Sequence, residues 1–231
     1  MRKYILHVLI ISFVFLSTPT IQAASDVEEK IEEFKQAIRI GPDHAEAHYN
    51  LGTAYGKSGM YKDAIEAFKQ AIRINPDFAQ AHYNLGVAYG ESGKNKKAIK
   101  SYKRAIRIDP DYAQAHLNLG VVYGNSGKNE KAIKSYKKAI RINPDFAQAH
   151  YNLGVVYGES GKNKKAIKSY KRAIRIDPDY AQAHLNLGVV YGNSGKNEKA
   201  IKSYKKAIRI NPDFAQAHYN LGVVYGESGK N

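Results

Sequence analysis

Residues 79–112 read AQAHYNLGVAYGESGKNKKAIKSYKRAIRIDPDY, and this 34-residue pattern recurs through most of the chain. Residues 79–146 hold two such units, and residues 147–214 repeat them with one change, Ala88 to Val156. A fixed period of this length is typical of units that bury their apolar faces by stacking on their neighbours. The function of such a chain has to be sought in what a repeated surface can bind.

Each unit predicts two helices that pack against each other. Small and apolar residues form one stripe on each predicted helix. These are His82, Leu85, Gly86 and Tyr89 on the first helix, and Ala98, Tyr102, Ala105 and Ile106 on the second. Glycine and alanine at these positions allow the two helices to approach closely. Gly93 suits the left-handed end of the first helix.

The sequence also predicts how the helices are capped. We expect Asn95 to cap the second helix, and Pro110 to break the chain after it. Asp111 then begins the next helix, with Gln114 three residues later in the spacing of a capping box. The same spacing recurs at Asp43 and Glu46, Asp77 and Gln80, and Asp145 and Gln148.

The unit carries the pattern H-x2-L-G-x2-Y…A-x3-(F/Y)…P. In residues 79–112 its positions are His82, Leu85, Gly86, Tyr89, Ala98, Tyr102 and Pro110. This pattern resembles the tetratricopeptide repeat (TPR) family, with histidine where that family usually has tryptophan. The resemblance covers five full units, at residues 45–78, 79–112, 113–146, 147–180 and 181–214. It implies an all-α fold, a right-handed α-solenoid of TPR helical hairpins, and a role as a non-catalytic binding scaffold.

The two ends of the array differ from its middle. Residues 24–44 predict an N-terminal capping half-repeat with one helix over 26–40, and acids near its start suit the helix dipole. Residues 215–231 predict a C-terminal half-repeat with a first helix only. Its apolar face would then be exposed, so we expect self-association through this segment or early melting. The alternative is that the chain is a fragment of a longer protein.

The first 23 residues have the layout of a secretory signal peptide. Arg2 and Lys3 precede an apolar run over residues 5–16, and Ala23 marks the expected cleavage site. The run is shorter than the roughly 20 residues that span a bilayer. We therefore expect an exported protein, periplasmic or secreted, with an uncleaved membrane anchor as the alternative. The chain has no cysteine, which excludes disulfides and thiol chemistry.

Positive charge is concentrated in the central units. Residues 79–112 hold seven Lys and Arg against three Asp and Glu, a net charge of +4, and the chain as a whole carries +15. Lys100, Arg104 and Arg107 share one stripe of the second helix, which the TPR resemblance places on the convex outer face. This stripe is either a solvated face whose charge was multiplied by duplication, or a binder of polyanions or anionic membrane surfaces. Export makes nucleic acid an unexpected partner.

No motif in the sequence predicts catalysis, a metal site or a cofactor. The stretch from Gly90 to Lys94 lacks the first glycine and the Ser or Thr of a phosphate-binding loop. One histidine per unit places successive imidazoles about 10 Å apart, too far to share a zinc ion. Nothing resembles a nucleophile–base pair. We therefore expect no enzyme within this chain, although it could be the recognition array of a longer one.

A second stripe on the first helix is the candidate binding surface, and the TPR resemblance places it in the concave groove. Asparagine recurs there in every unit, beside tyrosine or leucine. The candidate peptide-binding residues are Asn50, Asn84, Asn118, Asn152, Asn186 and Asn220, with Tyr83, Tyr151, Gln114 and Gln148. A primary amide both donates and accepts, so a row of them can hold an extended peptide by its backbone. The alternative is that these asparagines tie adjacent helices together.

Overall fold

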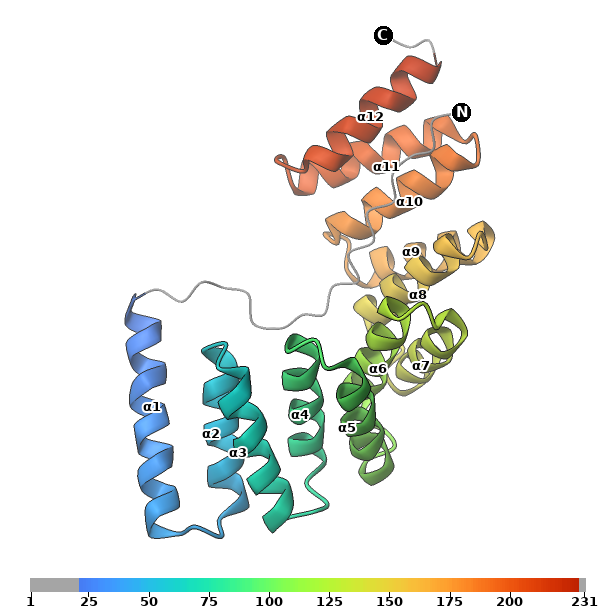
Figure 1. The fold of residues 1–231 in the computed structure, drawn as a ribbon. Helices are drawn as coiled ribbons and strands as arrows, with labels where there is room; N and C mark the ends of the chain where they lie inside the picture. The colour runs from blue at the N-terminus through green and yellow to red at the C-terminus, as the bar shows by residue number, and fades with distance from the viewer. Residues whose placement is uncertain (1–20, 229–231) are drawn as a thin grey trace. The chain divides into compact units, whose positions relative to one another are not determined.

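The computed structural model describes residues 21–228, which are helical throughout apart from short turns (Figure 1). The helices are α1 (Ile21–Ile40), α2 (Ala45–Lys57), α3 (Tyr61–Ile74), α4 (Ala79–Glu91), α5 (Asn95–Ile108), α6 (Ala113–Asn125), α7 (Asn129–Ile142), α8 (Ala147–Glu159), α9 (Asn163–Ile176), α10 (Ala181–Asn193), α11 (Asn197–Ile210) and α12 (Ala215–Ser228). Residues 21–228 contain no strand. The prediction of an all-α chain of helical hairpins is confirmed.

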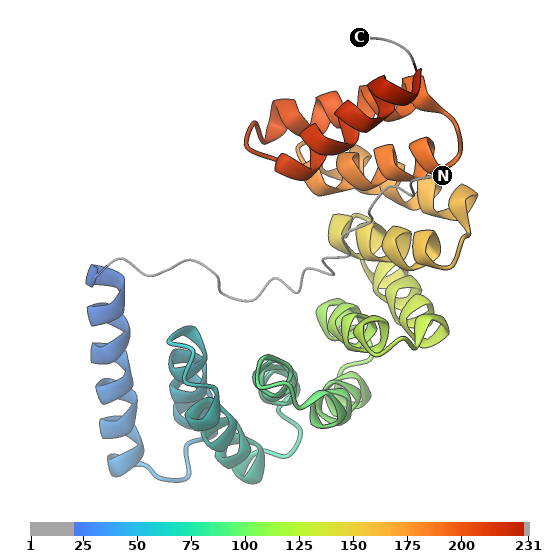
Figure 2. The ribbon, with the colours of Figure 1, turned by 45° about the horizontal axis from the view of Figure 1, so that its top comes forward.

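The chain divides into two compact units, with the boundary between Val122 and Tyr123. In the first unit, α2 pairs with α3 and α4 with α5, while α1 packs on α2 and α3 on α4. In the second unit, α8 pairs with α9 and α10 with α11, and α12 packs on α11. The paired helices of each hairpin lie side by side in Figures 1 and 2. Each unit is thus a stack of hairpins joined through neighbouring helices.

A glycine on the first helix and an aromatic ring on the second hold each hairpin together. A Cβ atom added at Gly86 would lie 2.6 Å from the Tyr102 ring, and one added at Gly188 would lie 2.5 Å from the Tyr204 ring. Both tyrosines are buried. The ring therefore occupies the space that a side chain would need, and only glycine allows this approach.

The first helices end as the sequence predicts. Gly93 has a φ of 70°, in the left-handed region, and the N–H of Lys94 donates to the carbonyl of Tyr89 at 2.8 Å. This is the bonding pattern of a left-handed glycine cap. The same positive φ recurs at Gly59, Gly127, Gly161 and Gly195.

The predicted helix starts are wrong in two respects. Helix α4 begins at Ala79, two residues after Asp77, and no side chain caps it. Asn75, the residue before Pro76, closes this turn instead, because its Oδ1 accepts a hydrogen bond from the N–H of Asp77 at 3.2 Å. Asn95 is the first residue of α5 rather than its cap, and the side chain of Lys94, at the capping position, makes no capping hydrogen bond.

The N-terminal helix also starts earlier than predicted, at Ile21 instead of residue 26. Residues 21–25 contain no glycine or proline to stop it, and the first turn holds no acid. The expected dipole interaction of acids with the first turn is therefore wrong. Ile31 is buried in a cluster with Leu51 and Ala54 of α2, which fixes α1 on the first hairpin.

Most of the predicted signal segment, residues 1–20, lies outside the described residues. Within residues 21–228, the longest helix is α1, and neither it nor any shorter helix has the length and hydropathy of a membrane span.

Candidate functional site

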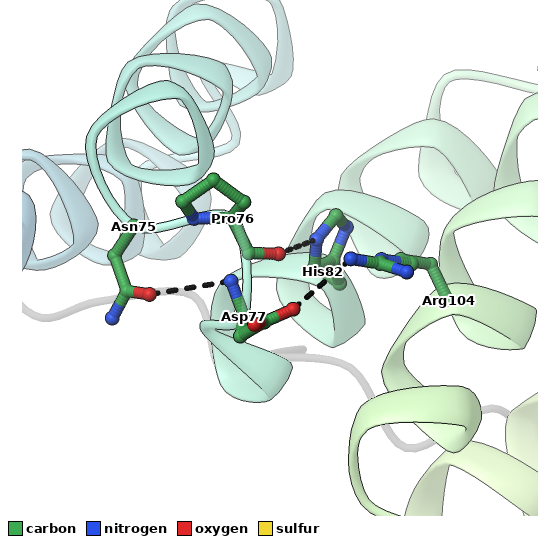
Figure 3. Close-up of polar contacts among 5 residues, drawn as sticks. All are labelled: Asn75, Pro76, Asp77, His82 and Arg104. Atoms are coloured by element: carbon green, nitrogen blue, oxygen red, sulfur yellow. Dashed lines mark hydrogen bonds and ion pairs between the residues drawn. The ribbon is translucent and has the colours of Figure 1, made fainter.

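The histidine of each unit is a structural tie between the first helix and the turn before it (Figure 3). His82 Nε2 lies 3.0 Å from the carbonyl oxygen of Pro76, so the ring donates to it. Equivalent contacts of 2.9 to 3.1 Å join His48, His116, His150, His184 and His218 to the prolines six residues earlier. Burial lowers the pKa of His82, which favours the neutral ring. The histidine, which stands where the family usually has tryptophan, thus fixes this turn.

The same turn carries an ion pair between successive 34-residue repeats. Arg104 on α5 lies 3.0 Å from Asp77, the residue expected to cap α4 (Figure 3). Arg172 and Asp145 form the equivalent pair at 2.9 Å. Both aspartates are mostly exposed, so each pair contributes at most about 1 kcal/mol to stability.

The asparagine row lies where the first helices of successive hairpins meet. The side-chain nitrogen of Asn84 donates to the hydroxyl of Tyr49 at 3.1 Å, and that of Asn118 donates to Tyr83 at 3.0 Å. In the second unit, Asn186 donates to Tyr151 at 3.1 Å. In each case the tyrosine stands 35 residues earlier in the sequence. For these three amides, the geometry favours the interpretation that asparagine ties adjacent helices.

The phenols that receive these bonds sit in an apolar layer. Tyr83 packs on Tyr112 with ring centroids 4.9 Å apart, and Tyr151 packs on Tyr180 at the same distance. Burial raises the pKa of Tyr112 to about 12 and that of Tyr83 further still, with Asn118 acting in the opposite direction on Tyr83. The hydroxyls therefore stay protonated near neutral pH, as both donors and acceptors.

Two members of the row differ, because the residue 35 positions earlier is leucine. Leu185 stands in this position for Asn220, and Leu117 for Asn152. Asn220 is fully buried, and its Nδ2 has no hydrogen-bond partner among the described residues. Its Oδ1 accepts a bond of 3.3 Å from Gln216. Both polar atoms of the fully buried Asn152 side chain lack a partner there.

The predicted binding residues therefore fall into three groups. Asn50 is exposed, whereas Asn84, Tyr83, Gln114 and Gln148 are half-buried. Tyr151 and the remaining asparagines are buried: Asn118, Asn152, Asn186 and Asn220. The structure brings tyrosine and asparagine of neighbouring hairpins together, and it also places Gln114 Nε2 at 3.3 Å from Asn118 Oδ1.

The phenol–amide pairs were not predicted from the sequence, although one signal was available. The tyrosine directly precedes the asparagine within a repeat, so each tyrosine stands 35 residues before the asparagine of the next repeat, one more than the 34-residue period. Among the described residues, histidines and acids form no group of three that could hold a metal ion.

Comparison with known proteins agrees with the repeat. The family model described as "TPR repeat" matches residues 25–59, 54–93, 90–127, 125–161, 156–195 and 193–229. No curated protein matches the chain by sequence.

Several solved structures are similar to this one. A crystal structure of MamA is 30% identical, covering 72% of this chain and 97% of its own, with a TM-score of 0.66. YrrB, described as "a TPR protein with an unusual peptide-binding site", is 24% identical over 82% of this chain and 97% of its own, with a TM-score of 0.67. PilF of Pseudomonas aeruginosa shares the fold, at 20% identity over 80% of this chain and 85% of its own, with a TM-score of 0.73. The chain therefore belongs to the TPR family, whose members generally serve as non-catalytic scaffolds for protein–protein interaction.

Proposed function

We propose that this scaffold holds an extended peptide segment of a partner protein along the asparagine row. The observation that carries the proposal is the pair of buried amides at Asn152 and Asn220, whose Nδ2 atoms lack a partner among the described residues. An unsatisfied buried polar group costs about 1–3 kcal/mol, so a peptide that supplies the missing bond recovers part of that cost. The similarity to YrrB, described as having a peptide-binding site, is consistent with such a role.

The chemistry of the amide suits this partner. A side-chain amide matches a peptide group, donor to carbonyl and acceptor to N–H, whatever side chains the partner carries. The half-buried Gln216 donates to Oδ1 of Asn220, so a peptide that binds this oxygen has to displace that bond. The half-buried Gln114 and Gln148 occupy the same position in their units and offer further amides beside the row.

The test separates peptide binding from the tying of helices. A peptide is first selected from a random displayed library on the full chain at high salt, which suppresses charge-driven binding. It is then synthesised with a fluorescent label, and its Kd is measured by anisotropy. The double variant Asn152→Leu, Asn220→Leu should weaken binding about tenfold, because two bonds of about 0.5–1.5 kcal/mol are lost. Its melting temperature should be equal to or above that of the parent.

The matched control changes the two asparagines that already bond to tyrosine. Asn118→Leu with Asn186→Leu leaves the hydroxyls of Tyr83 and Tyr151 without these donors, so its main effect should be lower stability. If the library yields no peptide, or if the Asn152 and Asn220 double variant binds the selected peptide as tightly as the parent, the proposal is wrong.

We also propose that the protein is exported, with cleavage after Ala23. The support is the basic start at Arg2 and Lys3, the apolar run over residues 5–16, and the small residue at the expected cleavage site. N-terminal sequencing of protein from a secreting host should begin at Ala24. Recovery of soluble cytoplasmic protein that retains Met1 would contradict export.

A further inference from the structure

The face opposite the asparagine row carries clefts that recur from hairpin to hairpin. One lies in the first unit between α3, α4 and α5, and two lie in the second unit, between α7, α8 and α9 and between α9, α10 and α11. Their volumes are about 620, 600 and 620 Å³, respectively. All three are built from equivalent residues, so the same cleft is made three times.

Each cleft has an apolar floor. In the cleft between α9, α10 and α11 the floor is formed by Ile174, Leu187 and Tyr191. Leu187 and Tyr191 are buried core residues, and Lys199 lies over the Tyr191 ring, 5.9 Å from its centroid. The stripe of cations expected on the outer face therefore lies around a hollow, and this hollow was not predicted from the sequence.

The rim of each cleft is cationic. Six Lys and Arg residues line each one, and no Asp or Glu is among the lining residues. They are Lys69, Lys97, Lys100, Lys103, Arg104 and Arg107 in the first unit. In the second unit they are Lys137, Lys165, Lys168, Lys171, Arg172 and Arg175, then Lys171, Lys199, Lys202, Lys205, Lys206 and Arg209.

The cations are only partly neutralised by the protein itself. Arg104 and Arg172 pair with Asp77 and Asp145. Lys69 in the first unit also pairs with Glu66 at 2.7 Å. The third cleft has Lys206 at this position, and no ion pair joins it to an acid in the described part of the chain. Lysines make up most of each rim, and an ammonium group attracts anions as a point charge, without the directional fork that arginine offers to a carboxylate.

We propose that these clefts bind a flexible, unbranched polymer of phosphate groups. A hollow lined by charge of one sign over a low-dielectric floor concentrates the electrostatic field and selects dense negative charge. In the second unit Lys171 lines both clefts, so a linear polymer that leaves one cleft at this lysine can enter the next. A duplex is too wide to enter hollows of this volume, and a bilayer presents its phosphates in a plane rather than along a line.

The probe is long-chain inorganic polyphosphate, with binding to the full chain measured over a range of salt concentrations. The test variant is Lys100→Gln, Lys168→Gln, Lys202→Gln, which removes one exposed rim lysine from each cleft. The matched control is Lys94→Gln, Lys162→Gln, Lys196→Gln, which removes the same charge from exposed turn positions outside the clefts. Circular dichroism and melting temperature confirm that both variants are folded.

We expect the cleft variant to bind polyphosphate at least about tenfold more weakly than the parent. The slope of log K against log salt concentration should be smaller in magnitude by up to about two, and both quantities should change much less in the control. Polyphosphate should bind far more tightly than tripolyphosphate, because one long chain fills several clefts at once. An equal loss of affinity in the cleft and control variants would show that binding depends only on net charge, and this would overturn the proposal. Binding to anionic phospholipid vesicles or duplex DNA as tight as to polyphosphate would overturn the assignment to a linear polymer.

Discussion

At the scale of the residue, the side chain 35 positions earlier decides whether a buried asparagine is satisfied. Leu185→Tyr should place a hydroxyl beside Asn220 and raise the free energy of unfolding by about 0.5–1.5 kcal/mol. The site can hold a tyrosine, because Tyr49 packs on Phe78 at 4.9 Å and the equivalent of Phe78 after Leu185 is Phe214. Denaturant unfolding of the full chain measures the change.

The reverse substitution is the control for this prediction. Tyr151→Phe removes the hydroxyl that accepts from Asn186 and keeps the ring that packs on Tyr180. We expect it to lower stability by about 1 kcal/mol. Should Leu185→Tyr destabilise the protein while Tyr151→Phe leaves it unchanged, the phenol–amide bond is not the stabilising feature.

The histidine ties predict how stability depends on pH. Burial lowers the pKa of His82, His150 and His184 below the ordinary value of 6.5 that the unfolded chain retains. The folded state then binds fewer protons, so these groups destabilise the fold as pH falls below 6.5 and through their folded pKa values. Replacing all three with glutamine keeps an amide donor for the proline carbonyl but removes the titration. The melting temperature of this variant should fall less than that of the parent on acidification, and parallel curves would contradict the assignment.

These residue-scale features were only partly visible in the sequence. The sequence analysis placed successive histidines too far apart to share a zinc ion, but it did not predict their bonds to the proline carbonyls, because these depend on a turn geometry that the sequence does not specify. The same holds for Asp77, whose spacing to Gln80 suggested a capping box. In the structure Asn75 closes the turn and Asp77 pairs with Arg104, because the helix begins two residues later than the spacing implied.

At the scale of the element, we expect alanine substitutions at two glycines of α4 to have opposite effects on stability. A Cβ atom at Gly86 would meet the Tyr102 ring at 2.6 Å, so Gly86→Ala should force the hairpin apart and cost about 1–3 kcal/mol. At Gly90 the nearest atom is the Tyr102 hydroxyl oxygen at 4.0 Å, so Gly90→Ala should stabilise the helix by up to about 1 kcal/mol. Thermal unfolding of both variants is the measurement. A stabilising Gly86→Ala would show that the close packing of ring on helix is not essential.

The hairpins themselves followed from the sequence with little ambiguity. The apolar stripe, the small residues and Gly93 all favoured the same pair of helices, and local and long-range preferences agreed. The clefts could not be predicted in the same way. The cleft between α9, α10 and α11, for example, combines Ile174 from one hairpin with Leu187 and Tyr191 from the next. Spacing within one helix does not reveal which side chains of different helices enclose a hollow.

At the scale of the whole molecule, a repeated chain depends on neighbouring helices for burial, and within residues 21–228 helix α12 has fewer of them than α10. Leu187 of α10 is buried, whereas Leu221, its equivalent in α12, is only half-buried. The Tyr204 ring lies against Gly188, whereas no atom of the described residues lies within 4 Å of a Cβ atom added at Gly222. Tyr219 is 54% exposed. Among residues 21–228, the part of α12 around Leu221 and Gly222 is therefore less covered than its equivalent in α10.

We propose that the 231-residue chain self-associates through α12, or that α12 unfolds before the rest, since burying one large apolar side chain contributes about 1.5–3 kcal/mol. Residues 228–231 repeat the sequence of residues 194–197, so appending the sequence of residues 198–214 after Asn231 supplies a second helix in register. Its tyrosine would lie over Gly222 as Tyr204 lies over Gly188. The extended chain should melt at a higher temperature and sediment as a monomer at all concentrations. If the original chain is already monomeric at high concentration, and its α12 amides exchange as slowly as those of α10, the lower coverage of α12 has no consequence for association or stability.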